Sequence, residues 1–432
     1  MENRKVLIVT YYWPPAGGPG VQRWLKFSKY LPELGIQPII YTPENPSYPQ
    51  LDESLLAEIP KKIKVVKTKI WEPYQIAEFL NPKSKAYKVG QFEKKEKQSW
   101  LTKVSVFIRG NFFIPDARKF WVQPSIQFLK NYLVENETDT IITTGPPHSL
   151  HLIGWKLKQL NPDLKWLADF RDPWTQISYH SELKLTSFAQ KKHENLEKKV
   201  LQSADVVIAS SFSDAENYKK SGANRVEVIT NGFEESDFTN LIKKSGNSSF
   251  IITYSGGLEM ARNPLVIWKA LQEIIQENQE FKEKLQLVFY GNISKDVRNS
   301  LQENGLIDFV IEKGYVSHKE SIIGIKEASL LILTNFPDEK SKGIIPGKLF
   351  EYVATQNPIL AVGPSDSDVE KILIETQSGN YFTQEEKESV KQYISAVFVN
   401  RNQNKKEGIS EKIQVYSRRK LAGKLAELIA TL

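Results

Sequence analysis

The sequence predicts an α/β protein built on two parallel sheets. Short apolar runs rich in β-branched residues alternate with longer segments of helical periodicity, and this alternation occurs twice along the 432 residues. The polar segment 232–249, which contains KKSGNSS, separates the two sets. We therefore expect one domain at residues 1–235 and a second at 236–411. A C-terminal helix at 412–432, with Leu421, Leu425, Leu428 and Ile429 on one face, is expected to return to the first domain.

The first domain is predicted to contain seven strands, at residues 5–10, 37–42, 63–68, 139–144, 165–169, 205–209 and 226–230. Helical periodicity follows the first strand over residues 21–34, and it recurs at 149–160 and 187–202. In the second domain we expect strands at residues 250–255, 285–290, 309–311, 330–334 and 358–362. Its helices are predicted at 263–277, 294–304, 318–326 and 347–354.

Composition excludes several classes of function. The chain has no cysteine, which rules out disulfides, zinc–thiolate sites, iron–sulfur clusters and thiol nucleophiles. The N-terminal sequence MENRKVLIVTYYWPPAGGPG lacks a signal-peptide pattern, and no stretch approaches about 18 apolar residues, the length that spans a membrane. We therefore expect a cytoplasmic protein.

The net charge of +7 is concentrated in one segment. Between Lys83 and Lys119 there are ten basic and three acidic residues, an excess equal to the net charge of the whole chain. A nucleic-acid-binding protein would be basic more uniformly, so we expect no nucleic-acid partner. Aromatic residues are interleaved here, and residues 98–109 have the pattern of a short amphipathic helix. Two interpretations of this 81–120 insertion stay open: contact with anionic lipid or an acidic or lipid-linked substrate, or a solvated loop whose aromatics pack on the core.

The first predicted strand leads directly into PPAGGPG and then a helix. Gly17, Gly18 and Gly20 permit positive φ and close approach of a ligand, and the helix start offers amides to an anion. Arg23 stands where a dinucleotide fingerprint has its third glycine, and no clear acidic residue ends the second strand. A dinucleotide-dependent oxidoreductase is therefore poorly supported, and a glycine-rich turn without a ligand is the alternative.

The strongest local signal is IIPGKLFEY at residues 344–352. Pro346 suits the first position of a helix, and the amides of residues 347–349 are then free to face a diphosphate. Lys348 adds positive charge, and Glu351 lies one turn later on the same face, where its carboxylate can accept hydrogen bonds from two ribose hydroxyls. We expect this helix start to hold a nucleotide; the alternative is a surface Lys–Glu pair.

A second glycine pair ends the first strand of the second domain. Tyr254 and Ser255 precede Gly256 and Gly257, and Arg262 follows just before a helix. Glycines bring backbone close to a ligand, and an arginine can neutralise a leaving diphosphate by bidentate contact. The alternative is an ordinary turn with a solvated arginine.

In order and spacing, these pieces resemble the family 4 glycosyltransferases of the GT-B fold over nearly the whole chain. The matching segments are the glycine-rich loop, TGPPHS at 144–149, DFRDPW at 169–174, ITNGF at 229–233, YSGG at 254–257 and GKLFEY at 347–352. The resemblance implies two Rossmann-like domains facing each other across a cleft. It implies a nucleotide-sugar donor on the C-terminal domain and a sugar or lipid-linked acceptor on the N-terminal one. It also implies retention of anomeric configuration, with no metal and no cofactor beyond the donor substrate.

Several residues depart from the family pattern. Glu351 resembles the second glutamate of the E-x7-E motif, but the first falls at Gly343. The arginine that usually follows the phosphate-loop glycine is Gly257, whereas the later basic residue is retained as Arg262. Lys348 is a candidate substitute for the missing cation. The family's active-site histidine is replaced at Arg171 or Asp172, which leaves His148 as a candidate one loop earlier.

These comparisons define the candidate site. Donor binding is assigned to Gly256, Gly257, Arg262, Gly347, Lys348, Leu349 and Glu351. The acceptor or phosphate loop is assigned to Gly17, Gly18, Gly20 and Arg171. Catalytic roles are assigned to Arg262 and Lys348, because fixed positive groups stabilise a leaving diphosphate without a metal. The resemblance implies catalytic roles near the acceptor hydroxyl for Asp172 and His148. Two structural alternatives stay open: a salt-bridged turn at 169–172, and a His148 that merely begins its helix.

The predicted function is sugar transfer from a nucleotide-sugar to an acceptor hydroxyl, in the assembly of a bacterial surface polysaccharide or glycolipid. The protein is expected to be cytoplasmic, with peripheral attachment at the inner face of the plasma membrane through residues 83–119. Two alternatives stay open: a sugar-nucleotide epimerase of the same fold, and a nucleotide-sugar or membrane-surface binding protein that has lost catalysis.

Overall fold

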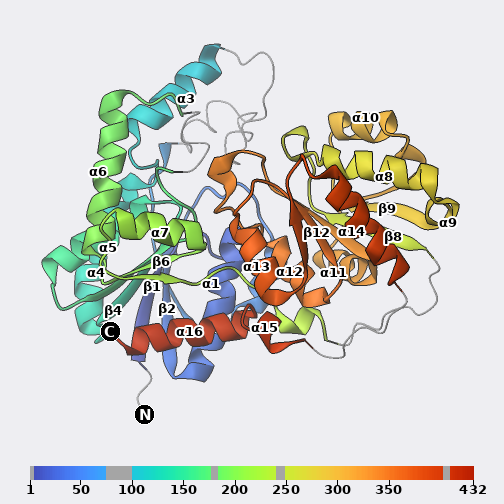
Figure 1. Cartoon of the computed structure of the whole chain (residues 1–432). Coiled ribbons are helices and arrows are strands. Elements are labelled where there is room, and N and C mark those ends of the chain that lie inside the picture. The colour runs from blue at the N-terminus through green and yellow to red at the C-terminus, as the bar shows by residue number, and fades with distance from the viewer. Residues whose placement is uncertain (1–3, 74–99, 177–182, 240–248, 402–408) are drawn as a thin grey trace. The chain divides into compact units, whose positions relative to one another are not determined.

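The computed structural model describes residues 4–73, 100–176, 183–239, 249–401 and 409–432 (Figure 1). The chain divides into two compact units, one formed by residues 1–230 with 421–432 and the other by residues 231–420. None of the helices in the described ranges is both long and apolar enough to cross a membrane.

The first unit is a seven-stranded parallel sheet in the order β3-β2-β1-β4-β5-β6-β7. Its strands are β1 (Arg4–Val9), β2 (Ile36–Pro43), β3 (Lys64–Thr68), β4 (Thr140–Gly145), β5 (Lys165–Phe170), β6 (Val206–Ala209) and β7 (Val226–Val228). All seven were predicted, with ends that differ by at most two residues. The inner strands are rich in apolar residues that pack on both faces of the sheet, whereas edge strands β3 and β7 are only partly buried.

Helices cover the two faces of this sheet (Figure 1). They are α1 (Pro19–Tyr30), α4 (Lys119–Glu135), α5 (Ser149–Leu160), α6 (Ser187–Ser203), α7 (Phe212–Lys220) and α16 (Arg418–Ala430). Another helix, α3 (Trp100–Phe112), packs on α6 instead. Leu7 and Val9 of β1 pack in one core cluster with side chains of α4 to α7. Val6 and Ile8, on the opposite face, pack in another with side chains of α1 and α16.

The 81–120 insertion is only partly described. Residues 81–99 lie outside the described ranges, whereas the helix predicted at 98–109 is found as α3, Trp100–Phe112. The end of the insertion leads into α4. The sequence analysis missed this helix because Pro124 interrupts its helical periodicity. Trp121 of α4 is fully buried and its ring stacks on Tyr41, with centroids 4.9 Å apart. At this position the core-packing interpretation of the aromatics is correct.

The second unit is a six-stranded parallel sheet in the order β10-β9-β8-β11-β12-β13. Its strands are β8 (Phe250–Ser255), β9 (Leu285–Tyr290), β10 (Val310–Gly314), β11 (Leu330–Thr334), β12 (Ile359–Val362) and β13 (Gly379–Phe382). Its helices are α8 (Leu265–Glu277), α9 (Gln279–Lys284), α10 (Lys295–Glu303), α11 (His318–Glu327), α12 (Lys348–Thr355), α13 (Asp368–Thr376), α14 (Lys387–Val399) and α15 (Glu411–Gln414). The sequence analysis missed β13, α9, α13 and α14 here, and α7 in the first unit.

The continuous C-terminal helix was a wrong prediction. The segment forms α15 and then α16, with a break at residues 415–417. The break exists because the backbone there pairs with Phe233, whose amide donates to Tyr416 O at 3.2 Å and whose carbonyl accepts from Arg418 N at 2.9 Å. Leu421 and Leu425 of α16 are buried in the same core cluster of the first unit as Val6.

Candidate functional site

The second unit brings together the residues predicted to bind a donor, at the point where β8 ends. Ser255 is the last residue of β8, and Gly256 follows in a left-handed conformation with φ of 102°. The loop after β9 crosses it closely: a Cβ at Gly291 would lie 2.6 Å from Gly256 O. Glycine is needed at both positions, one for its dihedral angle and one for this approach.

The amide, hydroxyl and carbonyl of Ser255 each form a hydrogen bond. Its amide donates to the Tyr352 hydroxyl at 2.8 Å, and its own hydroxyl lies 2.8 Å from that of Ser321. Its carbonyl oxygen accepts from Lys348 Nζ at 2.5 Å. Tyr352 and Lys348 belong to α12 and Ser321 to α11, so the starts of both helices are fixed against the end of β8.

Two cations lie at this loop. Lys348 Nζ is 3.8 Å from the centroid of the Tyr254 ring, and Arg262 Nη2 donates to Gly257 O at 3.0 Å. Burial is the main cause that lowers the pKa of Lys348, with a further contribution from Arg262. Burial also favours the neutral Tyr254 phenol, but Lys348 and Arg262 outweigh it, so the pKa of Tyr254 lies below its ordinary value. The loop is therefore electropositive enough to favour an anion.

The start of α12 differs in detail from the prediction. The helix begins at Lys348 with Gly347 as its N-cap, so Pro346 lies outside it. The Leu349 amide, expected to be free, donates to Pro346 O at 2.9 Å, and the Leu349 side chain is buried. Gly347 is exposed with φ of −55°, and a Cβ there would meet nothing within 4 Å. Open space therefore adjoins the helix start at Gly347.

Lys348 and Glu351 each have a different partner. Lys348 extends to Ser255, whereas Glu351 Oε1 lies 3.0 Å from His318 Nε2, at the start of α11. The other ring nitrogen of His318 is 4.0 Å from Asp237 Oδ2. This contradicts the alternative of a simple surface Lys–Glu pair. Sequence reasoning missed His318 and Asp237, since neither lies in a recognisable motif.

In the first unit, the glycine-rich loop divides into two parts. Gly18 has φ of 93°, and a Cβ there would meet nothing within 4 Å. Gly20 is different, because the Arg171 guanidinium occupies the space that a side chain at this position would fill. Arg171 also donates to Pro146 O at 3.3 Å and lies 3.7 Å from Asp172 Oδ2. The structure thus brings Gly20, Arg171 and Asp172 together, but Gly20 makes room for this chain's own arginine.

His148 immediately precedes α5 and is 6% exposed. Its ring stacks on Trp174, with centroids 5.1 Å apart and planes inclined by 5°. The rings of His151 and Phe170 lie within 6 Å of it. This environment favours the structural interpretation of His148 over a catalytic one.

Asp169 and Arg23 form a buried ion pair that the sequence analysis did not predict. Arg23 donates to Asp169 through Nη2 at 2.8 Å and through Nε at 3.3 Å, and both side chains are at most 2% exposed. Asp169 also accepts from Trp24 and Thr144, each at 2.9 Å. Arg23 stands where a dinucleotide fingerprint has its third glycine, and the ion pair with Asp169 explains why an arginine is found there.

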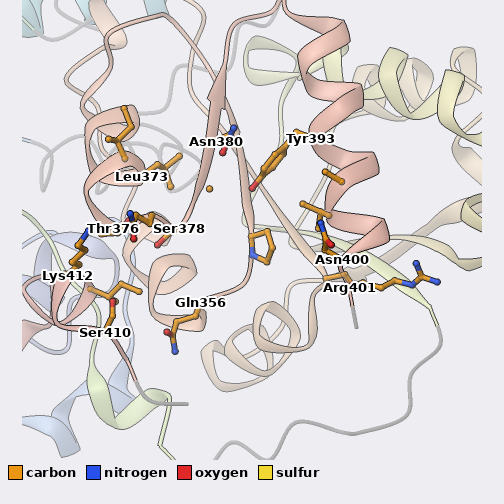
Figure 2. Close-up of a pocket in the computed structure, with 18 of the residues that line it drawn as sticks. Gln356, Leu373, Thr376, Ser378, Asn380, Tyr393, Asn400, Arg401, Ser410 and Lys412 are labelled. Atoms are coloured by element: carbon orange, nitrogen blue, oxygen red, sulfur yellow. The ribbon is translucent and has the colours of Figure 1, made fainter. Parts of the chain in front are cut away.

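A large pocket lies elsewhere in the second unit (Figure 2). Its volume is about 1060 Å³, and Ser329, Pro358 and Ser378 line it just before or at the starts of β11, β12 and β13. Parallel α/β sheets bind ligands at the carboxyl ends of their strands, which is the opposite edge. None of the predicted site residues lines this pocket.

Among the described residues, no group of three or more His, Asp or Glu side chains is placed to hold a metal ion.

No family model and no curated protein matches this chain. Solved structures do match. Sucrose-phosphate synthase from Thermosynechococcus elongatus is 14% identical, with 99% of this chain and 98% of that chain covered and a TM-score of 0.62. The lipopolysaccharide outer core galactosyltransferase WaaB is 14% identical over 99% and 100%, with a TM-score of 0.59. HepE from Anabaena, in complex with UDP-glucose, is 12% identical over 99% and 100%, with a TM-score of 0.57.

A putative UDP-N-acetylglucosamine 2-epimerase from Listeria monocytogenes also matches, at 10% identity over 99% and 96% of the two chains and a TM-score of 0.54. Identities this low establish the fold alone. With its parallel sheets of seven and six strands, the chain has the fold of the GT-B glycosyltransferases.

Proposed function

We propose that this chain is a glycosyltransferase that moves a sugar, of the hexose type, from a nucleotide-sugar to an acceptor hydroxyl. The observation that carries the proposal is the convergence of Lys348 and Arg262 on the carbonyls that flank Gly256, beside the open start of α12. The UDP-glucose complex of HepE, a protein of the same fold, supports a nucleotide-sugar as donor. Retention of configuration and independence of metal remain part of the proposal.

In this mechanism the diphosphate lies against the Gly256–Gly257 loop. Cleavage of the bond to the anomeric carbon leaves negative charge on the diphosphate, and Lys348 and Arg262 would stabilise it as it develops. Both cations are already held by backbone carbonyls, so little reorganisation is needed when the charge appears. The partial positive charge at the start of α12 acts in the same direction.

Glu351 is proposed to accept hydrogen bonds from the ribose hydroxyls. It lies three residues beyond Lys348 and is partly exposed, with its side chain 29% accessible. Gly343 replaces the other acid of the family motif, so backbone groups or water must bind the sugar hydroxyls that this acid would bind.

The acceptor is proposed to bind the first unit at the carboxyl end of β1. Gly17, Gly18, Gly20 and Arg171 were predicted for the acceptor, and the half-buried rings of Tyr12 and Tyr48 stack nearby with centroids 6.2 Å apart. Aromatic faces and a guanidinium suit a carbohydrate that bears an anionic group. The catalytic assignments of Asp172 and His148 rest on the resemblance alone.

Attachment to an anionic membrane is proposed through an aromatic–basic patch of the first unit. The patch consists of Trp71, Ile108, Phe112, Phe113, Lys119 and Phe120. Trp71 is 50% and Phe112 65% exposed, and the rings of Trp71 and Phe120 meet edge to face at 4.6 Å. Lys119 lies over Phe113 and Phe120, and its pKa is lowered by burial and then by nearby Lys192. Exposed rings beside clustered cations suit a surface of anionic lipid, which agrees with a role in polysaccharide or glycolipid assembly.

A thermal-shift screen of UDP-, GDP- and ADP-sugars tests donor binding, because a ligand that binds the native state raises its apparent stability. Glu351→Ala should abolish the shift while the protein stays folded. Release of nucleoside diphosphate that depends on an added acceptor then supports transfer. An epimerase would convert the donor without an acceptor, and a binding protein would do neither. No response to any nucleotide-sugar would contradict the proposal.

A further inference from the structure

His318 is the first residue of α11, and its position is fixed by contacts on both sides. Ser317 and Glu320 form a capping box at the start of the helix. The Ser317 side chain accepts from the Glu320 amide, and the Glu320 side chain accepts from the Ser317 amide. One turn further along α11, the Ser321 hydroxyl lies 2.8 Å from that of Ser255 at the candidate phosphate loop. The start of α11 is therefore held against the same loop as Lys348.

The imidazole of His318 lies between two carboxylates from different elements. Nε2 is 3.0 Å from Glu351 Oε1 on α12, and Nδ1 is 4.0 Å from Asp237 Oδ2 in the segment Glu235–Asp237. Neutral histidine can donate to Glu351 through Nε2–H, but it carries no charge to attract Asp237 at 4.0 Å. Protonated histidine forms a charge-assisted hydrogen bond to Glu351 and an ion pair with Asp237.

We propose that His318 is a positioning residue, which orients the Glu351 carboxylate for the ribose hydroxyls and tightens nucleotide-sugar binding when its ring is protonated. The inference rests on the proposed function, because it needs Glu351 to bind ribose. His318 holds Glu351 Oε1, which leaves Oε2 to accept from a ribose hydroxyl. Its positive charge also favours the dianionic diphosphate.

Carboxylates from two other elements face His318. Asp237 and Glu351 face it, and Lys348 lies one turn before Glu351 on α12. On α11 itself, Glu320 bonds to Ser317. Histidine ordinarily titrates near pH 6.5. Burial lowers the pKa of Lys348, so the His318→Gln variant is needed to separate the two groups. By sequence, His318 is the only histidine between residues 231 and 420.

Isothermal titration calorimetry with the nucleotide-sugar that gives the largest thermal shift tests the proposal. A nucleotide-sugar is the right probe because its diphosphate is a diester and does not titrate between pH 6 and 8, unlike a free nucleoside diphosphate. For the unmodified chain, affinity should rise about three- to tenfold from pH 8 to pH 6. His318→Gln, whose amide still donates to Glu351, should keep the affinity at pH 8 and lose the rise.

Lys319→Gln is the matched control, an exposed cation on the same helix whose loss should leave the pH dependence intact. A flat pH profile in the unmodified chain, or a rise that persists in His318→Gln, would overturn the inference while the proposed function stands. No binding at any pH would overturn both. His318→Ala should weaken binding even at pH 8, because no group then orients Glu351; equal affinity would also contradict a positioning role.

Discussion

Lys348 Nζ lies 2.5 Å from the carbonyl oxygen of Ser255, so a side chain from the start of α12 places its charge beside the loop after β8. The family pattern has an arginine in that loop, where this chain has Gly257. A Cβ at Gly256 would be 3.2 Å from the same Nζ. The structure therefore agrees with the hypothesis that Lys348 supplies the missing cation from a different element.

The first prediction follows from this contact. Lys348→Met keeps the aliphatic stem against Tyr254 but removes the charge, so acceptor-dependent release of nucleoside diphosphate should fall about 10²–10³-fold. The free energy of unfolding should change little, because burial already disfavours the charged ammonium group of Lys348. Steady-state kinetics measure the effect, with Lys319→Met as the control. A rate equal to that of the unmodified chain would show that Lys348 does not act on the leaving group.

Gly347 provides a steric test of where the ligand lies. Alanine fits its φ of −55°, and its methyl group would meet no atom of the chain within 4 Å. Gly347→Ala should therefore fold normally, yet weaken nucleotide-sugar binding by about tenfold or more if a phosphate occupies that space. Gly423→Ala in α16 is the matched control, since its Cβ also meets nothing within 4 Å. Calorimetry that gives unchanged affinity for Gly347→Ala would place the diphosphate elsewhere.

The Arg23–Asp169 pair predicts a large effect on stability. Arg23→Leu leaves the Asp169 charge buried with only Trp24 and Thr144 as donors, which should cost about 3–5 kcal/mol. Urea unfolding followed by tryptophan fluorescence reports on the first unit, because eight of the nine tryptophans precede residue 231. Lys26→Leu, on the same helix, removes a partly exposed pair with Glu58 and should cost less than about 1 kcal/mol. Similar losses in the two variants would contradict the structural role of Arg23.

The elements of the fold were predictable where their cause is local. FIITYS predicts β8 because β-branched and aromatic residues are enriched in strands, and the glycines that follow predict the turn. The contacts of the site were not predictable in this way. Lys348 meets a residue 93 positions earlier, and Glu351 meets one 33 positions earlier. Which partner each side chain reaches depends on strand order, which no motif encodes.

The same argument explains two features that the sequence patterns did not show. Residues 411–432 have helical periodicity throughout, but pairing of Phe233 with the backbone at 416–418 interrupts the helix. Gly20 was interpreted as a ligand contact because glycine permits close approach, and it does so for Arg171 of the same chain. A sequence pattern shows that something must come close, but not whether that group belongs to the protein.

The aromatic–basic patch predicts binding to anionic vesicles. The protein should sediment with vesicles of phosphatidylcholine and phosphatidylglycerol, less so as salt is raised, and not with phosphatidylcholine alone. A Phe112→Ser and Lys119→Ser double variant should weaken binding several-fold, because it removes an exposed ring and a cation. Val134→Ser, at an exposed position near the other end of α4, is the control. Equal sedimentation of both variants would exclude the patch as the attachment surface.

His151 predicts how the first unit responds to acid. Its ring is fully buried and stacks on Phe170, with centroids 4.3 Å apart, and burial lowers its pKa to about 3. The Thr143 hydroxyl accepts from Trp166 Nε1 at 2.9 Å and lies 2.9 Å from His151 Nδ1, so the buried neutral ring has a hydrogen-bond partner.

An unfolded histidine gains a proton below about pH 6.5, whereas His151 in the folded unit does not. The stability that the neutral ring contributes is complete above that pH and is lost as the pH falls toward 3, by about 1.4 kcal/mol for each unit. Urea unfolding of the first unit between pH 7 and pH 5 should show this slope. In His151→Gln, whose amide can still pair with the Thr143 hydroxyl, the slope should be shallower by that amount. An unchanged slope would mean that other groups govern the acid sensitivity.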